Sequence, residues 1–174
     1  MKLNSIEISA KMTRLILFCI LFIFTIPVNS QTRLPSVALK STDGEEVRLS
    51  DYMALNKPLI ISFWATYCGP CLDEFEAVTG LYEDWKKEID FEFIAVSIDD
   101  ARSASKVKSM ASGKKWPFIV LIDENQDIKR AMNVTDIPFC FIFDKSGKYV
   151  YKHAGYLPGD EIVMFKELKK ISDE

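Results

Sequence analysis

The stretch WATYCGPC, residues 64–71, joins two segments whose hydrophobic patterns differ. Residues 58–64 form a continuous apolar run, which is typical of a strand buried on both faces. Residues 70–88 follow with apolar side chains at helical spacing. The apolar face of this helix consists of Phe75, Val78, Tyr82 and Trp85. The sequence therefore predicts a buried strand that leads directly into a helix, with two cysteines at the junction.

These cysteines, Cys68 and Cys71, are separated by two residues, which lets both sulfur atoms meet in a small ring. The first turn of a helix presents unpaired backbone N–H groups and the positive end of the helix dipole. A thiolate there is stabilised, so its pKa falls below the free value of about 8.5, and the thiolate is the form that attacks disulfides. Pro70 lacks an N–H group, which costs nothing in a first turn. Spacing and context together indicate redox chemistry.

Two other interpretations of the cysteine pair stay open. A zinc site needs four ligands, and Cys140 and His153 would have to complete the set because the chain has no second CxxC. A purely structural disulfide would close so small a loop that it adds little stability. We expect neither a metal nor a cofactor.

The rest of the chain alternates between strand-like and helix-like segments. Residues 37–39 and 47–49 flank Asp43-Gly44, a hairpin signal because glycine accepts a positive φ. The further predicted strands are 91–98, 116–122, 139–143 and 149–153, and the further predicted helices are 101–111, 127–133 and a last helix from Asp160. The side chains expected on one side of the last helix are Ile162, Phe165 and Ile171. Such alternation predicts an α/β domain with a mixed sheet and helices on both faces.

Residues 1–30 have the composition of a targeting segment. Basic residues precede the apolar run 15–26, and a small polar residue stands just before Gln31. The run is shorter than the roughly 20 residues that span a bilayer. We therefore expect a secretory signal peptide over residues 1–30 and a folded domain over residues 31–174. Retention of the segment as an N-terminal membrane anchor is the alternative.

The composition of the 174 residues, with 48% hydrophobic and 27% charged residues, suits one globular domain. The formal net charge of −3 gives no general affinity for nucleic acid, which needs a basic surface. We expect a monomer without a nucleic-acid partner. Export would place the domain where disulfides persist, and its odd number of cysteines leaves one thiol without a partner in the chain.

The stretch WATYCGPC resembles the active-site segment of the thioredoxin superfamily. Residues 136–138, Asp-Ile-Pro, resemble the segment that bears the cis-proline of that superfamily. Residues 49–52, the additional strand and helix within 90–122, and residues 147–155 resemble the TlpA/ResA branch of exported disulfide reductases. The resemblance extends over residues 34–172. It implies a thioredoxin-like three-layer α/β fold with a mixed central sheet, helices on both faces and an N-terminal β-hairpin extension.

The resemblance also implies roles for the dithiol and one acid. Cys68 attacks a substrate disulfide, and Cys71 resolves the mixed disulfide, which leaves the two cysteines joined to each other. Glu74 lies one helical turn after Cys71, where the ResA-like branch has a glutamate that can exchange protons with the buried thiol. Thioredoxin instead uses an aspartate two residues before the tryptophan, and this chain has Ser62 there. An ordinary exposed helix acid is the alternative for Glu74.

Other residues are expected to support the site. Gly69 and Pro70 resemble the pair found in reducing members of the superfamily, whereas oxidants and isomerases more often have a histidine there. Pro138 would follow a cis peptide bond, with an ordinary trans proline as the alternative. The backbone of Ile137 would pair with an extended substrate segment opposite the attacking sulfur. Trp64 would shield the dithiol, or else be a core residue without a role in the chemistry.

Two reactive side chains are given no role in the reaction. Cys140 is expected to be a small buried apolar residue, and a regulatory disulfide is the alternative because its strand face can point toward the active-site helix. His153 is expected on the surface of the last strand, with no motif that places it near the dithiol.

The sequence thus predicts an exported thiol–disulfide oxidoreductase that reduces protein disulfides, either periplasmic or anchored and facing the periplasm. By resemblance, apocytochrome c is a substrate, and an upstream thiol-transfer reductant, such as a membrane protein, restores the dithiol. A disulfide oxidase or isomerase of the same fold is the main alternative, and a copper chaperone or a non-catalytic binding module is less favoured. A peroxiredoxin is disfavoured because Thr66 stands two residues before Cys68 rather than three.

Overall fold

The computed structural model describes residues 34–172, and residues 1–30, for which a signal peptide or an anchor is predicted, lie outside the described residues. Strands and helices alternate along the described chain. In order they are β1 (Ala38–Ser41), β2 (Glu46–Arg48), α2 (Leu49–Met53), β3 (Leu59–Trp64), α3 (Gly69–Glu88), β4 (Glu92–Ser97), η1 (Ala101–Ser103), α4 (Ala104–Lys114), β5 (Ile119–Ile122), α5 (Asp127–Ala131), β6 (Phe139–Phe143), β7 (Tyr149–Ala154) and α6 (Asp160–Ser172).

The strands of residues 34–172 form one mixed sheet in the order β2-β1-β5-β4-β3-β6-β7. The central strands β3, β4 and β5 are parallel, whereas β1 pairs with β5, and β6 with β3, in antiparallel fashion. The hairpin β1–β2 turns through Gly44, whose φ of 88° lies in the region that favours glycine. The mixed sheet and the N-terminal hairpin confirm the predicted fold class.

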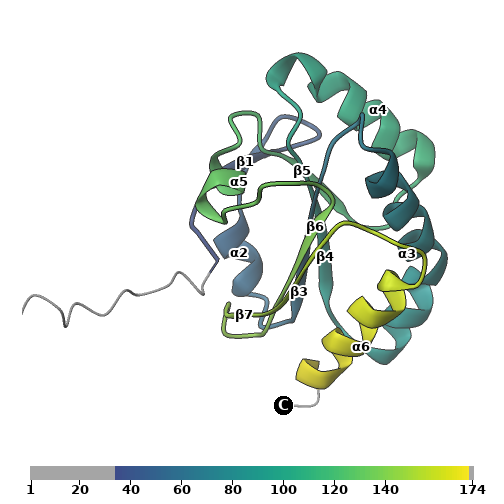
Figure 1. Cartoon of the computed structure of the whole chain (residues 1–174). Helices are drawn as coiled ribbons and strands as arrows, with labels where there is room; N and C mark the ends of the chain where they lie inside the picture. Colours follow the sequence, from purple (N-terminus) through teal and green to yellow (C-terminus); the bar gives the residue numbers. More distant parts are fainter. Residues whose placement is uncertain (1–33, 173–174) are drawn as a thin grey trace, which may run out of the picture. The chain divides into compact units, whose positions relative to one another are not determined.

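Helices lie on both sides of the sheet (Figure 1). The long helix α3 packs against α6 on one side, while α2 and α5 lie on the other. Because β3 and β4 are parallel, their C-terminal ends meet at one edge of the sheet. The chain leaves β3 at this edge and enters α3 after four residues, so this edge carries the two cysteines of the dithiol.

Phe75 anchors the start of α3 to the sheet. Its ring makes edge-to-face contacts with Trp64 of β3 and Phe93 of β4, at centroid distances of 5.5 and 6.1 Å. It also contacts Trp116, which precedes β5, at 5.1 Å. Ring pairs in such geometry add about 0.5–1.5 kcal/mol each to the effect of burial. The helix face predicted from the sequence is buried along its whole length: Phe75, Val78, Tyr82 and Trp85.

The largest differences in extent from the prediction are in β5 and α4, and one further element, α2, was not predicted. The strand β5 begins at Ile119 rather than at residue 116, because Pro117 has no N–H group for the sheet ladder. The helix α4 continues to Lys114, three residues further than predicted. The short helix α2 follows β2 directly and buries Leu49, which was expected to belong to the strand.

The buried face of α6 differs from the predicted one. Met164 and Leu168 are buried, whereas Ile162 is 54% exposed. At 3.6 residues per turn, Ile162 lies about 160° around the helix from Met164 and about 120° from Leu168, so it cannot share their side. Of the three residues predicted on one side, Phe165 and Ile171 are partly buried against the core, and the Phe165 ring stacks on Trp85 of α3 at 4.8 Å.

Within residues 34–172, we find no helix whose length and apolar character would allow it to cross a membrane.

Candidate active site

The dithiol lies at the N-terminus of α3. Cys68 is the N-cap residue of the helix, and its Sγ accepts a hydrogen bond from the backbone N–H of Cys71 at 3.3 Å. The two cysteines are joined by a disulfide, with their Cα atoms 5.3 Å apart. Cys68 is 7% exposed, whereas Cys71 is completely buried. The more accessible sulfur is therefore the one at the positive end of the helix dipole.

The surface around Cys68 is open to a protein substrate. Tyr67, just before it, is 71% exposed. Gly69 faces open space, since no atom lies within 4 Å of the position that a Cβ would take. Pro70 occupies the first turn of α3 and lines a groove of about 510 Å³. The other residues that line this groove are Asp73, Glu76, Ala77, Tyr156 and Pro158.

A carboxylate that the sequence analysis missed holds the segment before Cys68. Asp99, only 4% exposed, accepts hydrogen bonds from the backbone N–H and from Oγ1 of Thr66, both at 2.8 Å. It also accepts one from Ser97 Oγ at 2.7 Å. The position of Asp99 in the sequence could have indicated this contact. Residues that follow two neighbouring parallel strands come together at one edge of the sheet. Asp99 stands two residues after β4, just as Thr66 stands two residues after β3.

Glu74 lies inside the protein, one helical turn after Cys71. Its carboxyl group accepts a hydrogen bond from Ser62 Oγ at 3.0 Å, and the residue is 2% exposed. Burial raises the pKa of Glu74 to about 7; the hydrogen bond from Ser62 opposes this rise, and the charge of Asp160 adds to it. The alternative of an exposed helix acid is therefore wrong. A buried carboxyl with a pKa near neutrality can take up and release a proton at physiological pH.

The peptide bond between Ile137 and Pro138 is cis, as predicted. Pro138 is buried, and its carbonyl accepts a hydrogen bond from the Gly155 N–H at 2.8 Å. Ile137 is partly exposed. The backbone hydrogen bonds found among residues 34–172 include none from its N–H or to its C=O. These groups are therefore available to an incoming strand.

Trp64 lies in the core beneath α3. It is completely buried and packs edge-to-face on Phe75 and on Trp116, whose ring centroid is 5.0 Å away. The structure thus places Trp64 at the end of β3 within the aromatic cluster that positions the helix start.

Cys140 lies on the same side of the sheet as Glu74. In the register of β3 and β6, Cys140 is directly opposite Ser62, and directly opposite residues direct their side chains to one face. Because Ser62 donates to Glu74, that face is the one under α3. Cys140 is a free thiol and buried, which confirms the prediction of a buried residue. Burial raises the pKa of its thiol well above the ordinary value, and the charge of Glu74 acts in the same direction.

His153 lies at the surface of β7, as expected, but the structure also brings it close to the site, which no sequence motif indicated. His153 is directly opposite Cys140 in the register of β6 and β7, so it shares the face under α3. Its Nε2 lies 3.1 Å from an Asp160 carboxylate oxygen, and its side chain is 38% exposed. Together with Glu74 it lines a small cavity of about 10 Å³. The sheet register, which the sequence does not reveal, brings it there.

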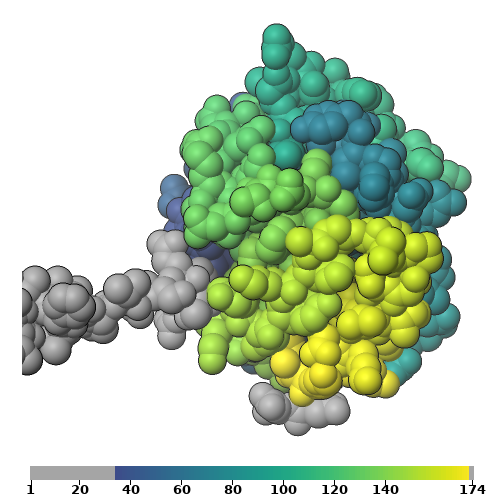
Figure 2. Space-filling view, viewed as in Figure 1, coloured from purple at the N-terminus to yellow at the C-terminus, as the bar shows by residue number. Residues whose placement is uncertain are grey.

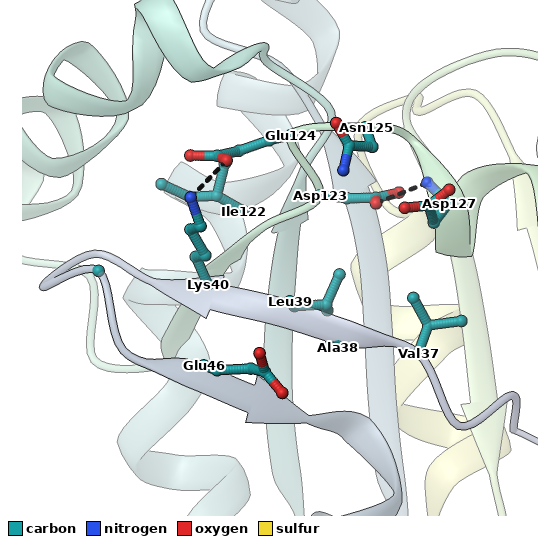
Figure 3. A pocket seen from close by; sticks show the side chains of 11 residues that line it. Val37, Ala38, Leu39, Lys40, Glu46, Ile122, Asp123, Glu124, Asn125 and Asp127 are labelled. Atoms are coloured by element: carbon teal, nitrogen blue, oxygen red, sulfur yellow. Dashed lines mark hydrogen bonds and ion pairs between the residues drawn. The ribbon is translucent and has the colours of Figure 1, made fainter.

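A larger hollow of about 440 Å³ lies between β1 and the loop after β5 (Figure 3). An ion pair of 2.7 Å joins Lys40 and Glu124 in this hollow. The buried Asp123 carboxylate accepts the backbone N–H of Asp127 at 2.7 Å at the start of α5. None of the lining residues belongs to the dithiol stretch or to the cavity beside Glu74, so we assign the hollow no part in thiol chemistry.

Among residues 34–172, no three His, Cys, Asp or Glu side chains are grouped so that they could hold a metal ion.

The pattern of the family described as AhpC/TSA matches residues 31–152. The chain belongs to the AhpC/TSA family. A protein named thiol-disulfide oxidoreductase ResA, from Geobacillus kaustophilus (strain HTA426), is 30% identical over 148 residues, which cover 80% of this chain and 82% of that protein. The thioredoxin-like protein YneN of Bacillus subtilis (strain 168) is 30% identical over 129 residues, which cover 74% of this chain and 73% of that protein.

The solution structure of a thioredoxin-like protein from Porphyromonas gingivalis matches this AhpC/TSA-family chain with a TM-score of 0.73 and 45% sequence identity. The match covers 84% of this chain and 95% of the other. With the disulfide at the start of α3, these similarities identify a thiol-disulfide oxidoreductase of the ResA type. The predicted family and enzyme class are confirmed.

Proposed function

We propose that this thiol-disulfide oxidoreductase is exported and that it reduces disulfide bonds in proteins outside the cytoplasm. The pattern of residues 1–30, a basic flank and a short apolar run, supports export. The Gly-Pro pair between the cysteines supports reduction, because it resembles the pair of reducing members of the superfamily. The observation that carries the proposal is the asymmetry of the dithiol, in which Cys68 caps the helix and keeps 7% of its surface exposed whereas Cys71 is completely buried.

In the proposed reaction, the Cys68 thiolate attacks one sulfur of a substrate disulfide. A mixed disulfide forms, and the other substrate sulfur leaves as a thiolate. The Cys71 thiol then loses its proton and attacks Cys68. The second substrate sulfur leaves, so that the substrate gains two electrons and the dithiol loses two. The disulfide between Cys68 and Cys71 is the product of this cycle on the enzyme.

The second step needs a proton acceptor inside the protein. Apolar surroundings raise the pKa of a thiol, and Cys71 is completely buried. We assign this acceptor role to Glu74, which lies one helical turn away on α3 and has a pKa near 7. Ser62, which stands where thioredoxin has an aspartate, holds the carboxyl by its hydrogen bond rather than titrating itself.

We assign substrate binding to the cis-proline loop. The unpaired backbone groups of Ile137 support strand addition by a substrate segment, while buried Pro138 fixes the start of β6. Gly69 and Pro70 leave the approach to Cys68 open, and Trp64 supports the start of α3 from below. Apocytochrome c is the substrate that we propose first. A thiol-transfer protein of the membrane would be the reductant that restores the dithiol.

The test is to trap the mixed disulfide in the native host with Cys71→Ala, which leaves Cys68 able to attack but removes the second step. We expect captured proteins whose disulfides accumulate in a strain that lacks this enzyme, apocytochrome c among them. The matched control is the double variant Cys68→Ala/Cys71→Ala, which should capture nothing. Captured substrates that accumulate as free thiols in the deletion strain would instead indicate an oxidase.

Export is tested separately by mass spectrometry of the protein from the native host. An N-terminus at or within a few residues of Gln31 is expected after cleavage, whereas an intact N-terminus in the membrane fraction would indicate the anchor. Recovery of the intact chain from the cytoplasm would overturn export.

A further inference from the structure

A row of polar side chains crosses three neighbouring strands beneath α3. Ser62 of β3, Cys140 of β6 and His153 of β7 are directly opposite one another in the sheet register. Their Cβ atoms are therefore about 5 Å apart from one strand to the next, on one face of the sheet. Glu74 is bonded to Ser62 at the inner end of the row, and Asp160 is bonded to His153 at the outer end.

A cavity of about 10 Å³ lies between the two ends of this row. Roughly 10–15 Å³ is the space that one water molecule needs, provided that the site offers it polar partners. Acidic, thiol, phenol and imidazole groups supply such partners here. The residues that line the cavity are Glu74, Cys140, Tyr151, His153, Gly155, Tyr156, Asp160 and Met164.

The exposure of the side chains changes along this row. Glu74 is only 2% exposed, so it has very little surface of its own through which to exchange a proton with solvent. The side chains of His153 and Asp160 are 38% and 28% exposed. They lie in β7 and at the start of α6, and Figure 2 shows the yellow segment that contains α6 at the surface of the molecule, next to the lime-coloured β7.

We propose that this cavity, with the pair of His153 and Asp160 at its outer end, is the route by which Glu74 exchanges its proton with solvent. The inference rests on the proposed role of Glu74 as the acceptor for the Cys71 proton. His153 and Asp160 act on the reaction only through Glu74 and do not contact the reacting sulfur atoms.

The chemistry of the outer pair suits this task. Histidine is the side chain that most readily gains and loses a proton near neutral pH, and the Asp160 carboxylate holds the His153 ring at 3.1 Å. The charge of Asp160 also acts on Glu74 itself, where it raises the pKa of the carboxyl. The titratable groups that face Glu74 are Cys71 on its own helix, Cys140 of β6, Tyr151 and His153 of β7, Tyr156 of the following loop and Asp160 of α6.

One proton leaves by this route when the dithiol reduces a substrate, and one returns to the Cys71 thiolate when the disulfide is reduced again; no electrons move along the route. The thiol of Cys71 gives its proton to the Glu74 carboxylate when it attacks Cys68. The Glu74 carboxyl passes the proton through the cavity to the pair of His153 and Asp160. The pair releases it to bulk water, and Glu74 is again a carboxylate for the next turnover.

The test measures multiple-turnover reduction of insulin by the protein, with an excess of a small dithiol as electron donor. We expect His153→Ala to slow turnover near neutral pH by about tenfold, which is less than the roughly 100-fold minimum for a group that itself transfers the proton to the reacting atom, because His153 acts only through Glu74. Free imidazole in the buffer should restore the rate, because it can enter the space left by the ring and carry the proton. A structural role of His153 would not respond to imidazole. Lys152→Ala is the matched control, since this neighbour is exposed and points to the other face of the sheet.

Combination with Glu74→Gln separates this inference from the proposed function. If both hold, Glu74→Gln slows turnover, and His153→Ala causes no further loss in that background. An unchanged rate in Glu74→Gln would overturn the acceptor role and the route together. Slow turnover by Glu74→Gln together with normal turnover by His153→Ala would overturn the route but not the acceptor role of Glu74. Rate losses that multiply in the double variant would do the same. His153→Gln, which keeps a hydrogen bond to Asp160, should behave like His153→Ala if the chain folds normally in both.

Discussion

At the scale of single residues, Cys68 and Cys71 differ in exposure and in their contact with the helix end. Cys68 accepts the N–H of Cys71 and keeps some exposed surface, so its thiolate is both stabilised and reachable. In the reduced protein, iodoacetamide should therefore modify Cys68 first, with an apparent pKa below the free value of about 8.5. Peptide mass mapping across a pH series measures this. Faster modification of Cys71 would reverse the roles of the two sulfurs.

Glu74 makes the stability of the folded domain depend on pH. Its pKa is about 7 in the folded protein against an ordinary value of 4.5, so between these values the folded state holds a proton that the unfolded chain has lost. The contribution of Glu74 to the free energy of unfolding is therefore fully present below this window and is lost as pH rises through it. At about 1.4 kcal/mol per pKa unit, the fall is at most roughly 3.5 kcal/mol.

Urea unfolding of the disulfide form from about pH 4 to about pH 8 measures this fall. Glu74→Gln should lack it, because the amide does not titrate. Glu76→Gln is the matched control: its side chain lies on the same helix but is 78% exposed, so this variant should keep the pH dependence of the unchanged protein. Parallel curves for Glu74→Gln and the unchanged protein would mean that Glu74 does not have a raised pKa.

At the scale of elements, Asp99 links the end of β4 to the segment that carries the dithiol. The Asp99→Asn variant replaces one acceptor oxygen with a donor that faces Thr66 or Ser97. A buried polar group left unsatisfied costs about 1–3 kcal/mol, so we expect a loss of stability of that size and slower insulin reduction. The control is Asp100→Asn at the neighbouring and more exposed residue, which should keep both its stability and its rate of insulin reduction. An unaffected Asp99→Asn would show that the bonds to Thr66 do not hold the segment in place.

The same scale shows where sequence patterns succeed. The strand β3 and the helix α3 were predicted because continuous burial and a 3.6-residue period are both local signals, and the structure buries all six residues of β3. The face of α6 was predicted wrongly for a local reason: at 3.6 residues per turn, Ile162 and Ile171 lie about 180° apart, so the residues assigned to one side cannot share it. The strand predicted over residues 116–122 was too long because it followed the apolar residues on both sides of Pro117. The proline itself indicated that the strand begins later.

At the scale of the whole molecule, the site was predictable in part. The dithiol, Glu74 and the cis-proline stand in recognisable local motifs. His153 and Asp99 do not, because only the register of β6 with β7 and the parallel pairing of β3 with β4 bring them to the site. Asp160 reaches it from the start of α6 through its contact with His153. Residues far apart in sequence need the assembled sheet before their chemistry can be seen.

The domain boundary is a property of the whole molecule as well. The buried core begins at Leu39 and ends at Leu168, so residues 31–174 contain all of it within the described chain. We expect a chain of residues 31–174 to unfold cooperatively and to reduce insulin without residues 1–30.

A shorter chain of residues 50–174 is the matched comparison. It lacks β1, which lies between β2 and β5, so β5 would become an unpaired edge strand. It also lacks Leu39 and Leu49, which are buried, and each lost buried leucine costs about 2–5 kcal/mol. Circular dichroism on heating should therefore show a sharp transition for residues 31–174 and a much lower or absent one for residues 50–174. Equal transitions would mean that the hairpin contributes nothing to the fold, and failure of the longer chain to fold would move the boundary before residue 31.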